Sequence, residues 1–246
     1  MTLFRAVAGV FVIMAIVVGR APAAWSEEQP RWQDTAELSF VQTGGNTDVT
    51  TIAAKNLLQY RLSDNWAMQW KAAALHAESD GEKTAERYET DLRTDYKGGE
   101  RIYYYGLAGW VQDTFAGLDQ RIYGGPGIGY RFLIGPRHQL VGELGAYYAR
   151  EKYTDGSADD LMEGRAYGKY QFKFSETVQF SQDLEYLHNF KDSAAYKLIS
   201  VSALQSKLNE WLAVRVAYEL RYDNRPTPAD LKNSDSLLTV SLVLNL

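Results

Sequence analysis

Residues 34–246 alternate between apolar and polar side chains with a period of two. In the last segment, Leu238, Val240 and Leu242 occupy one face, whereas Thr239 and Ser241 occupy the other. This pattern is typical of β-strands with one apolar and one polar face. Twelve such segments follow one another, each about ten to fourteen residues long, whereas strands of soluble domains usually have about five or six residues. The pattern predicts an all-β fold, a closed antiparallel up-and-down transmembrane β-barrel with twelve strands.

The breaks between these segments alternate between short turns and longer loops. Outer-membrane barrels have an even number of strands, short periplasmic turns and longer outer loops. The order of the breaks therefore predicts that both ends of the barrel domain lie on the periplasmic side. The short breaks are 63–65, 98–100, 135–136, 175–176 and 209–210, and the longer ones include 79–83, 115–120, 154–160 and 223–234.

The N-terminus has the organisation of a secretory signal peptide. Arg5 precedes an apolar stretch, residues 6–19, and the small residues of Ala21-Pro22-Ala23 suit a cleavage site. We expect a cleaved signal peptide over residues 1–23, a short periplasmic segment over 24–33 and an outer-membrane barrel over 34–246. An uncleaved anchor is the alternative interpretation. A signal peptide followed by a predicted transmembrane barrel points to the outer membrane of a Gram-negative bacterium.

Charge and cysteine content narrow the possible partners. The formal net charge of the whole chain is −5, and loss of Arg5 and Arg20 with the signal peptide would make it more negative. This sign argues against a nucleic-acid partner. The chain has no cysteine, which is compatible with export. We expect a monomer whose partners are outer-membrane lipid and, during biogenesis, the barrel-assembly machinery, and we assign no cofactor and no metal.

The inward face of the predicted barrel carries many charged side chains of both signs. Their near balance favours a lumen filled by paired side chains, or a very narrow pore, over an open channel. Twelve strands also lie between the roughly 8-stranded barrel that side chains fill and the 16–18-stranded porin with an open channel. The candidate lumen-lining residues are Lys55, Arg87, Glu89, Asp91, Arg93, Asp95, Gly125, Gly127, Gly129, Arg131, Glu143, Arg165, Lys169, Asp183, Glu185, Arg215, Glu219 and Arg221.

The glycine-rich segment 121–131 invites comparison with phosphate-binding loops. That hypothesis fails because the alternating pattern continues and no helix follows. Gly125, Gly127 and Gly129 fall on the inward face, where we expect them to leave room for long side chains from the opposite wall. Pro126 cannot donate a ladder hydrogen bond, so we expect a bulge or local irregularity there.

Aromatic residues collect near the predicted short turns. Amphipathic rings are enriched where a membrane wall meets water, so these residues form a predicted aromatic girdle. Its members are Tyr60, Trp66, Tyr96, Tyr103, Phe132, Phe172, Phe174 and Trp211.

The three histidines offer the only opening for an enzymatic hypothesis. His76 precedes Ser79, and His188 precedes Asn189 and Ser193, near the outer ends of strands. A lipid hydrolase on the barrel's outer face needs a histidine within hydrogen-bond reach of a serine. None of these arrangements is distinctive, and we assign no catalytic residue. A soluble periplasmic β-sandwich that binds a ligand is the remaining alternative.

Four segments resemble the YdiY-like family of outer-membrane proteins, which are described as salt-induced and have no known function. They are Gly44-Gly45-Asn46-Thr47-Asp48, residues 123–131, residues 147–151 and residues 223–235. The resemblance implies an outer-membrane barrel and a link to salt or osmotic stress, and it supplies no catalytic residues. Together with the charged interior, it suggests a narrow pore or an envelope-stabilising protein. The chain ends in Leu246 instead of the aromatic residue that is common at the end of such barrels.

Overall fold

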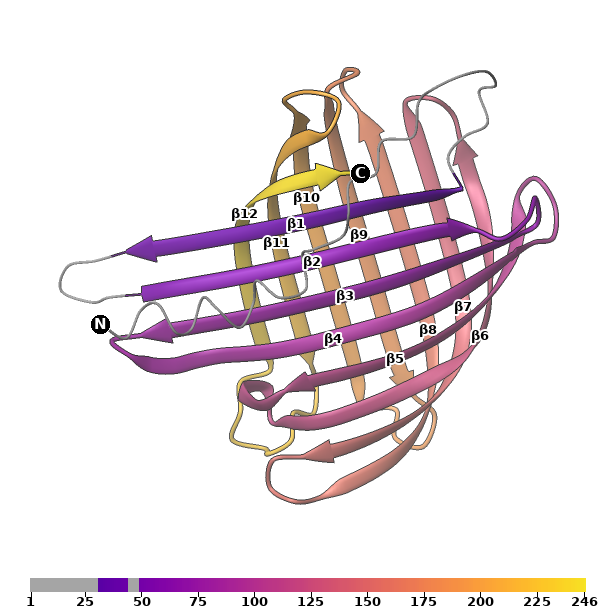
Figure 1. The fold of residues 1–246 in the computed structure, drawn as a ribbon. Helices are drawn as coiled ribbons and strands as arrows, with labels where there is room; N and C mark the ends of the chain where they lie inside the picture. Colours follow the sequence, from indigo (N-terminus) through magenta and orange to yellow (C-terminus); the bar gives the residue numbers. More distant parts are fainter. Residues whose placement is uncertain (1–30, 44–48) are drawn as a thin grey trace. The chain divides into compact units, whose positions relative to one another are not determined.

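The computed structural model describes residues 31–43 and 49–246 (Figure 1). The predicted signal peptide, residues 24–30 and the turn 44–48 lie outside the described residues. Residues Arg31–Leu246 form one compact unit. In the described part of the chain, no helix is long and apolar enough to cross a bilayer.

Twelve antiparallel strands form one closed barrel, as predicted. Each strand pairs with its neighbours in the chain, and β1 pairs with β12 to close the ring. This closure rules out the open sheets of the β-sandwich alternative. The strands are β1 (Trp32–Thr43), β2 (Val49–Arg61), β3 (Trp66–Ser79), β4 (Glu82–Lys97), β5 (Ile102–Asp113), β6 (Leu118–Ile134), β7 (His138–Tyr153), β8 (Ala158–Lys173), β9 (Val178–Asn189), β10 (Tyr196–Lys207), β11 (Leu212–Asp223) and β12 (Ser234–Asn245), with the 3-10 helix η2 (Thr114–Ala116) between β5 and β6.

The barrel has two different ends. At the short-turn end the connections have three or four residues, and both the start of β1 and the end of β12 lie there. We call the other end, which carries the connections 80–81, 114–117, 154–157, 190–195 and 224–233, the loop end. β1 begins at Trp32, two residues before the predicted start of the barrel.

Several predicted loops at the loop end are shorter than expected. The predicted break 79–83 is a two-residue turn, because Asp80 and Gly81 both adopt positive φ, at 53° and 81°. Two successive residues with positive φ match the type I′ turn, whose twist suits a tight hairpin. The breaks 115–120 and 154–160 are likewise shortened because β6 and β8 begin at Leu118 and Ala158.

Every strand keeps the same inside–outside order. Residues directly opposite each other in a sheet share a face, and along most of the barrel the ladder joins odd numbers to odd and even to even, as in Glu37↔Val243 and Leu38↔Leu242. Even-numbered Leu38, Leu144 and Leu242 are therefore at least half exposed, whereas odd-numbered Glu37 and Val243 are buried. The outer wall is apolar and the inner wall is polar.

Candidate functional site

Two tyrosines of β5 lie across glycines of β6 on the inner wall. The ladder pairs Tyr103 with Gly129 and Tyr105 with Gly127. A Cβ atom on either glycine would overlap the paired tyrosine ring. The prediction that these glycines make room for side chains from the opposite wall is wrong, because the neighbouring strand supplies the rings. Aromatic side chains that cover a neighbouring glycine in this way also help to fix strand register.

A buried ion-pair cluster continues from these rings toward β7 and β8. The Tyr103 hydroxyl donates a hydrogen bond to Glu143 at 2.6 Å. Arg93 and Arg165 also donate to the Glu143 carboxylate, at 2.8 and 2.7 Å. Arg165 forms a second ion pair with Glu185, and its side chain is only 7% exposed. This cluster, together with the tyrosines, fills the β5–β8 side of the lumen.

The assignment of Tyr103 to the aromatic girdle is wrong. Tyr103 is 6% exposed and lies on the inner wall beside Tyr105. Its odd number places it on the same face as the charged residues of β4, a signal that its closeness to the 98–101 turn obscured. A hydroxyl bonded to a buried carboxylate also has no reason to face outward.

The structure places the other seven girdle residues on the outer face near the short turns. Six are exposed, and Phe172 is half-buried. Neighbouring rings pack together, with centroids 5.0 Å apart for Trp66 and Tyr96 and 4.7 Å apart for Phe172 and Phe174. These seven residues are Tyr60, Trp66, Tyr96, Phe132, Phe172, Phe174 and Trp211.

Much of the remaining lumen is a single cavity of about 920 Å³. It begins under the β11–β12 connection at Thr227 and Leu231 and extends to Thr35, Leu57 and Gln69, near the short-turn end. The predicted residues that line it are Lys55, Arg87, Glu89, Asp91, Arg93, Arg165, Lys169, Asp183, Glu185, Arg215, Glu219 and Arg221.

The other predicted lumen residues do not line this cavity. Asp95 accepts hydrogen bonds from Arg93, and the Arg131 guanidinium lies 4.7 Å from the centre of the Tyr103 ring. Glu143, Gly125, Gly127 and Gly129 belong to the filled side of the lumen described above. Odd-numbered residues face the inner wall along most of the barrel, and we call this the odd-number rule. Sequence reasoning missed several lining residues that this rule would have found, namely Glu37, Lys71, Asp113, Arg121, Tyr123, Tyr147 and Lys197.

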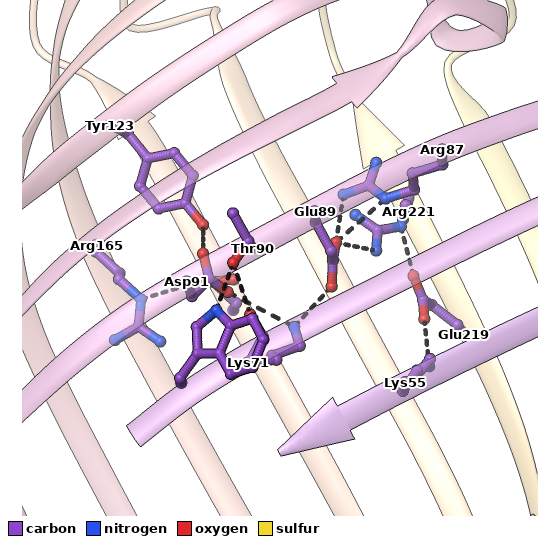
Figure 2. A network of polar contacts seen from close by, with 12 residues as sticks. Lys55, Lys71, Arg87, Glu89, Thr90, Asp91, Tyr123, Arg165, Glu219 and Arg221 are labelled. Atoms are coloured by element: carbon purple, nitrogen blue, oxygen red, sulfur yellow. Dashed lines mark hydrogen bonds and ion pairs between the residues drawn. The ribbon is translucent and has the colours of Figure 1, made fainter. Parts of the chain in front are cut away.

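Ion pairs cross the cavity between strands that are not neighbours (Figure 2). Glu89 on β4 receives Lys71 at 2.7 Å, Arg87 at 2.9 Å and, from β11, Arg221 at 3.7 Å. In the ring order, β4 and β11 are separated by β3, β2, β1 and β12. The side chains of the two walls therefore meet inside the lumen and narrow it.

The β11–β12 connection, residues 224–233, lies across the loop end of the barrel (Figure 1). A Cβ atom on Gly117, in the β5–β6 connection, would overlap the Thr227 carbonyl oxygen and lie 2.7 Å from a Leu231 methyl carbon. These two connections are on opposite sides of the ring. Arg225 and Asn224 anchor the base of the connection to Asp192 and to the Ala194 carbonyl.

Pro126 causes a local irregularity, as predicted, but no bulge: the β6–β7 ladder has no pair at residues 125 and 126. The β6–β7 register is the same on both sides of it, at Gly124↔Tyr148 and Gly127↔Gly145. The shifts in register lie elsewhere, at 118–120 and 131–133. A Cβ atom on Gly125 would overlap the Ala146 carbonyl oxygen, so the strands approach closely here. The proline therefore interrupts the pairing locally without an inserted residue.

The histidines lie on the outer face with acidic or aromatic partners. His76 contacts Glu78 at 2.9 Å, and His188 contacts the Tyr186 hydroxyl at 3.3 Å. His138 contacts the Tyr170 hydroxyl at 2.8 Å. Among the described residues, no hydrogen bond joins a histidine to a serine, and no group of three or more His, Cys, Asp or Glu side chains is placed to hold a metal ion. The hydrolase hypothesis thus has no assembled serine–histidine pair.

Two solved structures share this architecture. An outer membrane channel from Pseudomonas putida F1 has a TM-score of 0.53 and 9% identity, with 87% of this chain and 94% of the channel covered. The translocator domain of the autotransporter NalP from Neisseria meningitidis has a TM-score of 0.51 and 7% identity, with 89% of each chain covered. At such identities the likeness shows the fold alone, that of outer-membrane barrels.

Sequence comparison identifies the family. The chain is 27% identical over 212 residues to the uncharacterized protein YdiY of Escherichia coli K12. The aligned region covers 86% of this chain and 82% of YdiY. A family model described as "Protein of unknown function, DUF481" matches residues 36–245, nearly the whole barrel. The chain therefore belongs to the DUF481 family, and YdiY is a relative of this chain.

Proposed function

We propose that this protein resides in the outer membrane of a Gram-negative bacterium and forms a narrow water-filled passage for ions and small polar solutes. The observation that carries the proposal is the cavity of about 920 Å³, which spans most of the barrel from the β11–β12 connection to Gln69. At about 30 Å³ per water molecule, this volume holds on the order of 30 waters. A passage of this size excludes large solutes.

The apolar outer wall supports the membrane location. Large side chains such as Leu144, Leu238 and Phe40 are 65%, 63% and 59% exposed on it. A closed barrel satisfies its backbone polar groups between strands, which is the condition for crossing lipid. In this proposal the short-turn end is periplasmic, the chain acts as a monomer, and its partners are lipid and, during biogenesis, the barrel-assembly machinery.

Location and fold are tested first by fractionation and by electrophoresis in detergent with and without heating. We expect the protein in the outer-membrane fraction, with a folded band that shifts on boiling. Release of the protein by osmotic shock, or the same electrophoretic migration with and without boiling, would contradict the membrane proposal.

Conduction is tested with the purified, refolded protein in planar bilayers. We expect small, steady conductance steps, well below those of barrels with about 16 strands, whose channels are open. Boiled protein added at the same concentration is the control. Intact insertion without conductance would refute the passage and leave the barrel in place.

Glu89 is expected to control which ions pass. Its carboxylate is shared by Lys71, Arg87 and Arg221. Glu89→Gln removes this negative charge, and the three cations then face the passage without the carboxylate that they share. We expect the reversal potential in a KCl gradient to shift toward chloride, with a several-fold change in permeability ratio.

Glu86→Gln provides the matched control for this measurement. Glu86 lies on the same strand but contacts Lys83 instead of the lumen cations. Its replacement should leave the selectivity of the wild-type protein unchanged. If both variants shift the potential equally, Glu89 does not set the selectivity.

The cross-lumen ion pairs favour a second candidate, an envelope-stabilising barrel with a closed lumen. The β5–β8 side is already filled, and Arg221 reaches Glu89 from the far wall. The proposed link to salt or osmotic stress belongs to either candidate. A deletion strain and its complemented control, grown at low and high NaCl, test that link, and equal growth in both media would refute it.

A further inference from the structure

The seam between β1 and β12 is paired over only part of its length. Ladder pairs join residues 35–39 of β1 to residues 241–245 of β12. Beyond Ser39, residues 40–43 pair with β2, and residues 234–240 pair with β11, but the two described edges do not pair with each other. In Figure 1, β12 bends to run beside β1 only near its C-terminal end. The loop-end half of this seam is therefore unzipped.

A side chain marks the point where the ladder stops. The Ser39 hydroxyl donates a hydrogen bond to the Val240 carbonyl at 2.9 Å, the first carbonyl beyond the last paired residue of β12. Unpaired backbone at membrane depth is tolerated only where it lines a cavity or is covered by protein. Glu37 of β1 and Asp235 of β12 both line the main cavity, so this break lies beside it.

The chemistry along the break changes from apolar to charged. Val41, whose odd number assigns it to the inner wall, is nonetheless 40% exposed at the unzipped edge. Leu237, an odd-numbered residue of the unpaired part of β12, is paired with Glu219 on β11. Lys55 of β2 contacts Glu219 of β11 at 3.8 Å (Figure 2). This ion pair joins the strands that lie on the far sides of β1 and β12.

Arg221 adds a second cation to this position, since it pairs with Glu219. Lysine and arginine side chains are suited to binding phosphate groups. Meanwhile the connection 224–233 narrows the axial entrance and ends immediately before β12. A bulky molecule is therefore hindered at the axial entrance, whereas the side wall has an unpaired stretch between β1 and β12.

We propose that the loop-end half of the β1–β12 seam is a lateral port through which an acyl chain of a membrane phospholipid enters from the bilayer. The acyl chain contacts Val41 and Leu237, and the phosphate head group contacts Lys55 and Arg221. This inference rests on the membrane location in the proposed function and is independent of ion conduction.

The port is tested with the full-length folded protein in vesicles that contain a phosphatidylethanolamine carrying a diazirine on its acyl chain. After illumination, peptide mass spectrometry locates the adducts. We expect adducts on the outward residues Leu238 and Val240 and also on the inward residues Val41 and Leu237. Inward residues of the closed wall, such as Val111, should carry none.

Two variants sharpen this test. The chain has no cysteine, so Val41→Cys combined with Thr239→Cys introduces the only two thiols. Extension of the ladder would place these residues opposite each other, within the range of Cα separations that a disulfide requires. Oxidation should then abolish the adducts on Leu237, and reduction should restore them. Lys55→Gln should lower inward labelling several-fold and leave outward labelling unchanged.

The outcomes separate the port from the membrane location. Outward adducts without inward ones would overturn the port alone. No adducts on either face would overturn the membrane location and the port together. A covalent dimer formed through the cysteine of a single Val41→Cys variant, without inward adducts, would show that the edge pairs with a second copy of the chain instead of lipid.

Discussion

Replacing Arg165 with methionine should lower the free energy of unfolding by about 3–5 kcal/mol, because removal of one partner leaves buried charges without compensation. Arg165 holds Glu143 and Glu185 together and donates to the Tyr105 hydroxyl at 3.1 Å. The Glu143 side chain is only 3% exposed, so water cannot replace the guanidinium cheaply. Urea titration of the folded protein in detergent, followed by tryptophan fluorescence, measures the loss.

Arg150→Met is the matched control for this loss. Arg150 and Asp160 are 3.9 Å apart on the outer rim, and their side chains are 61% and 52% exposed. Exposed pairs of this kind contribute at most about 1 kcal/mol. Equal destabilisation by the two variants would mean that the buried cluster does not hold the β5–β8 wall together.

Gly125→Ala is expected to prevent most of the protein from folding. The added methyl group would overlap the Ala146 carbonyl oxygen, and a backbone atom in a ladder cannot rotate away as a side chain can. Overpacking of this kind typically costs about 1–3 kcal/mol, and we expect at least the upper value here. The fraction that migrates as the heat-sensitive band after refolding measures the effect.

Gly106→Ala tests whether any added methyl group has this consequence. Gly106 pairs with Pro126 on the neighbouring strand, but its nearest neighbour to an added Cβ is the Thr94 hydroxyl at 3.5 Å, an ordinary contact. This variant should refold like the wild type. A folded Gly125→Ala protein, or an unfolded Gly106→Ala protein, would show that the close approach at residue 146 does not limit assembly.

The barrel itself could be predicted because it follows from a local rule. Alternation places successive side chains on opposite faces, and a shift of one residue would move every apolar residue to the wrong face. Strand number and turn positions were therefore readable from residues 34–246. The prediction for Tyr103 failed where closeness to a turn was given more weight than the odd-number rule.

The contents of the lumen could not be predicted in the same way. Alternation shows that Glu89 and Arg221 face inward, but not that they meet from walls on different sides of the ring. Likewise, the glycines of β6 indicate space, whereas the stagger between β5 and β6 decides that Tyr103 and Tyr105 occupy it.

The chain by itself determined which side chains lie on the outer wall and which face the lumen, since that choice depends only on each residue's position in its own strand. The tertiary structure decided which inward charges are partners, how far β1 and β12 are zipped together, and where the connection 224–233 lies. These features depend on stagger and curvature summed around the whole ring, a property that no single strand encodes.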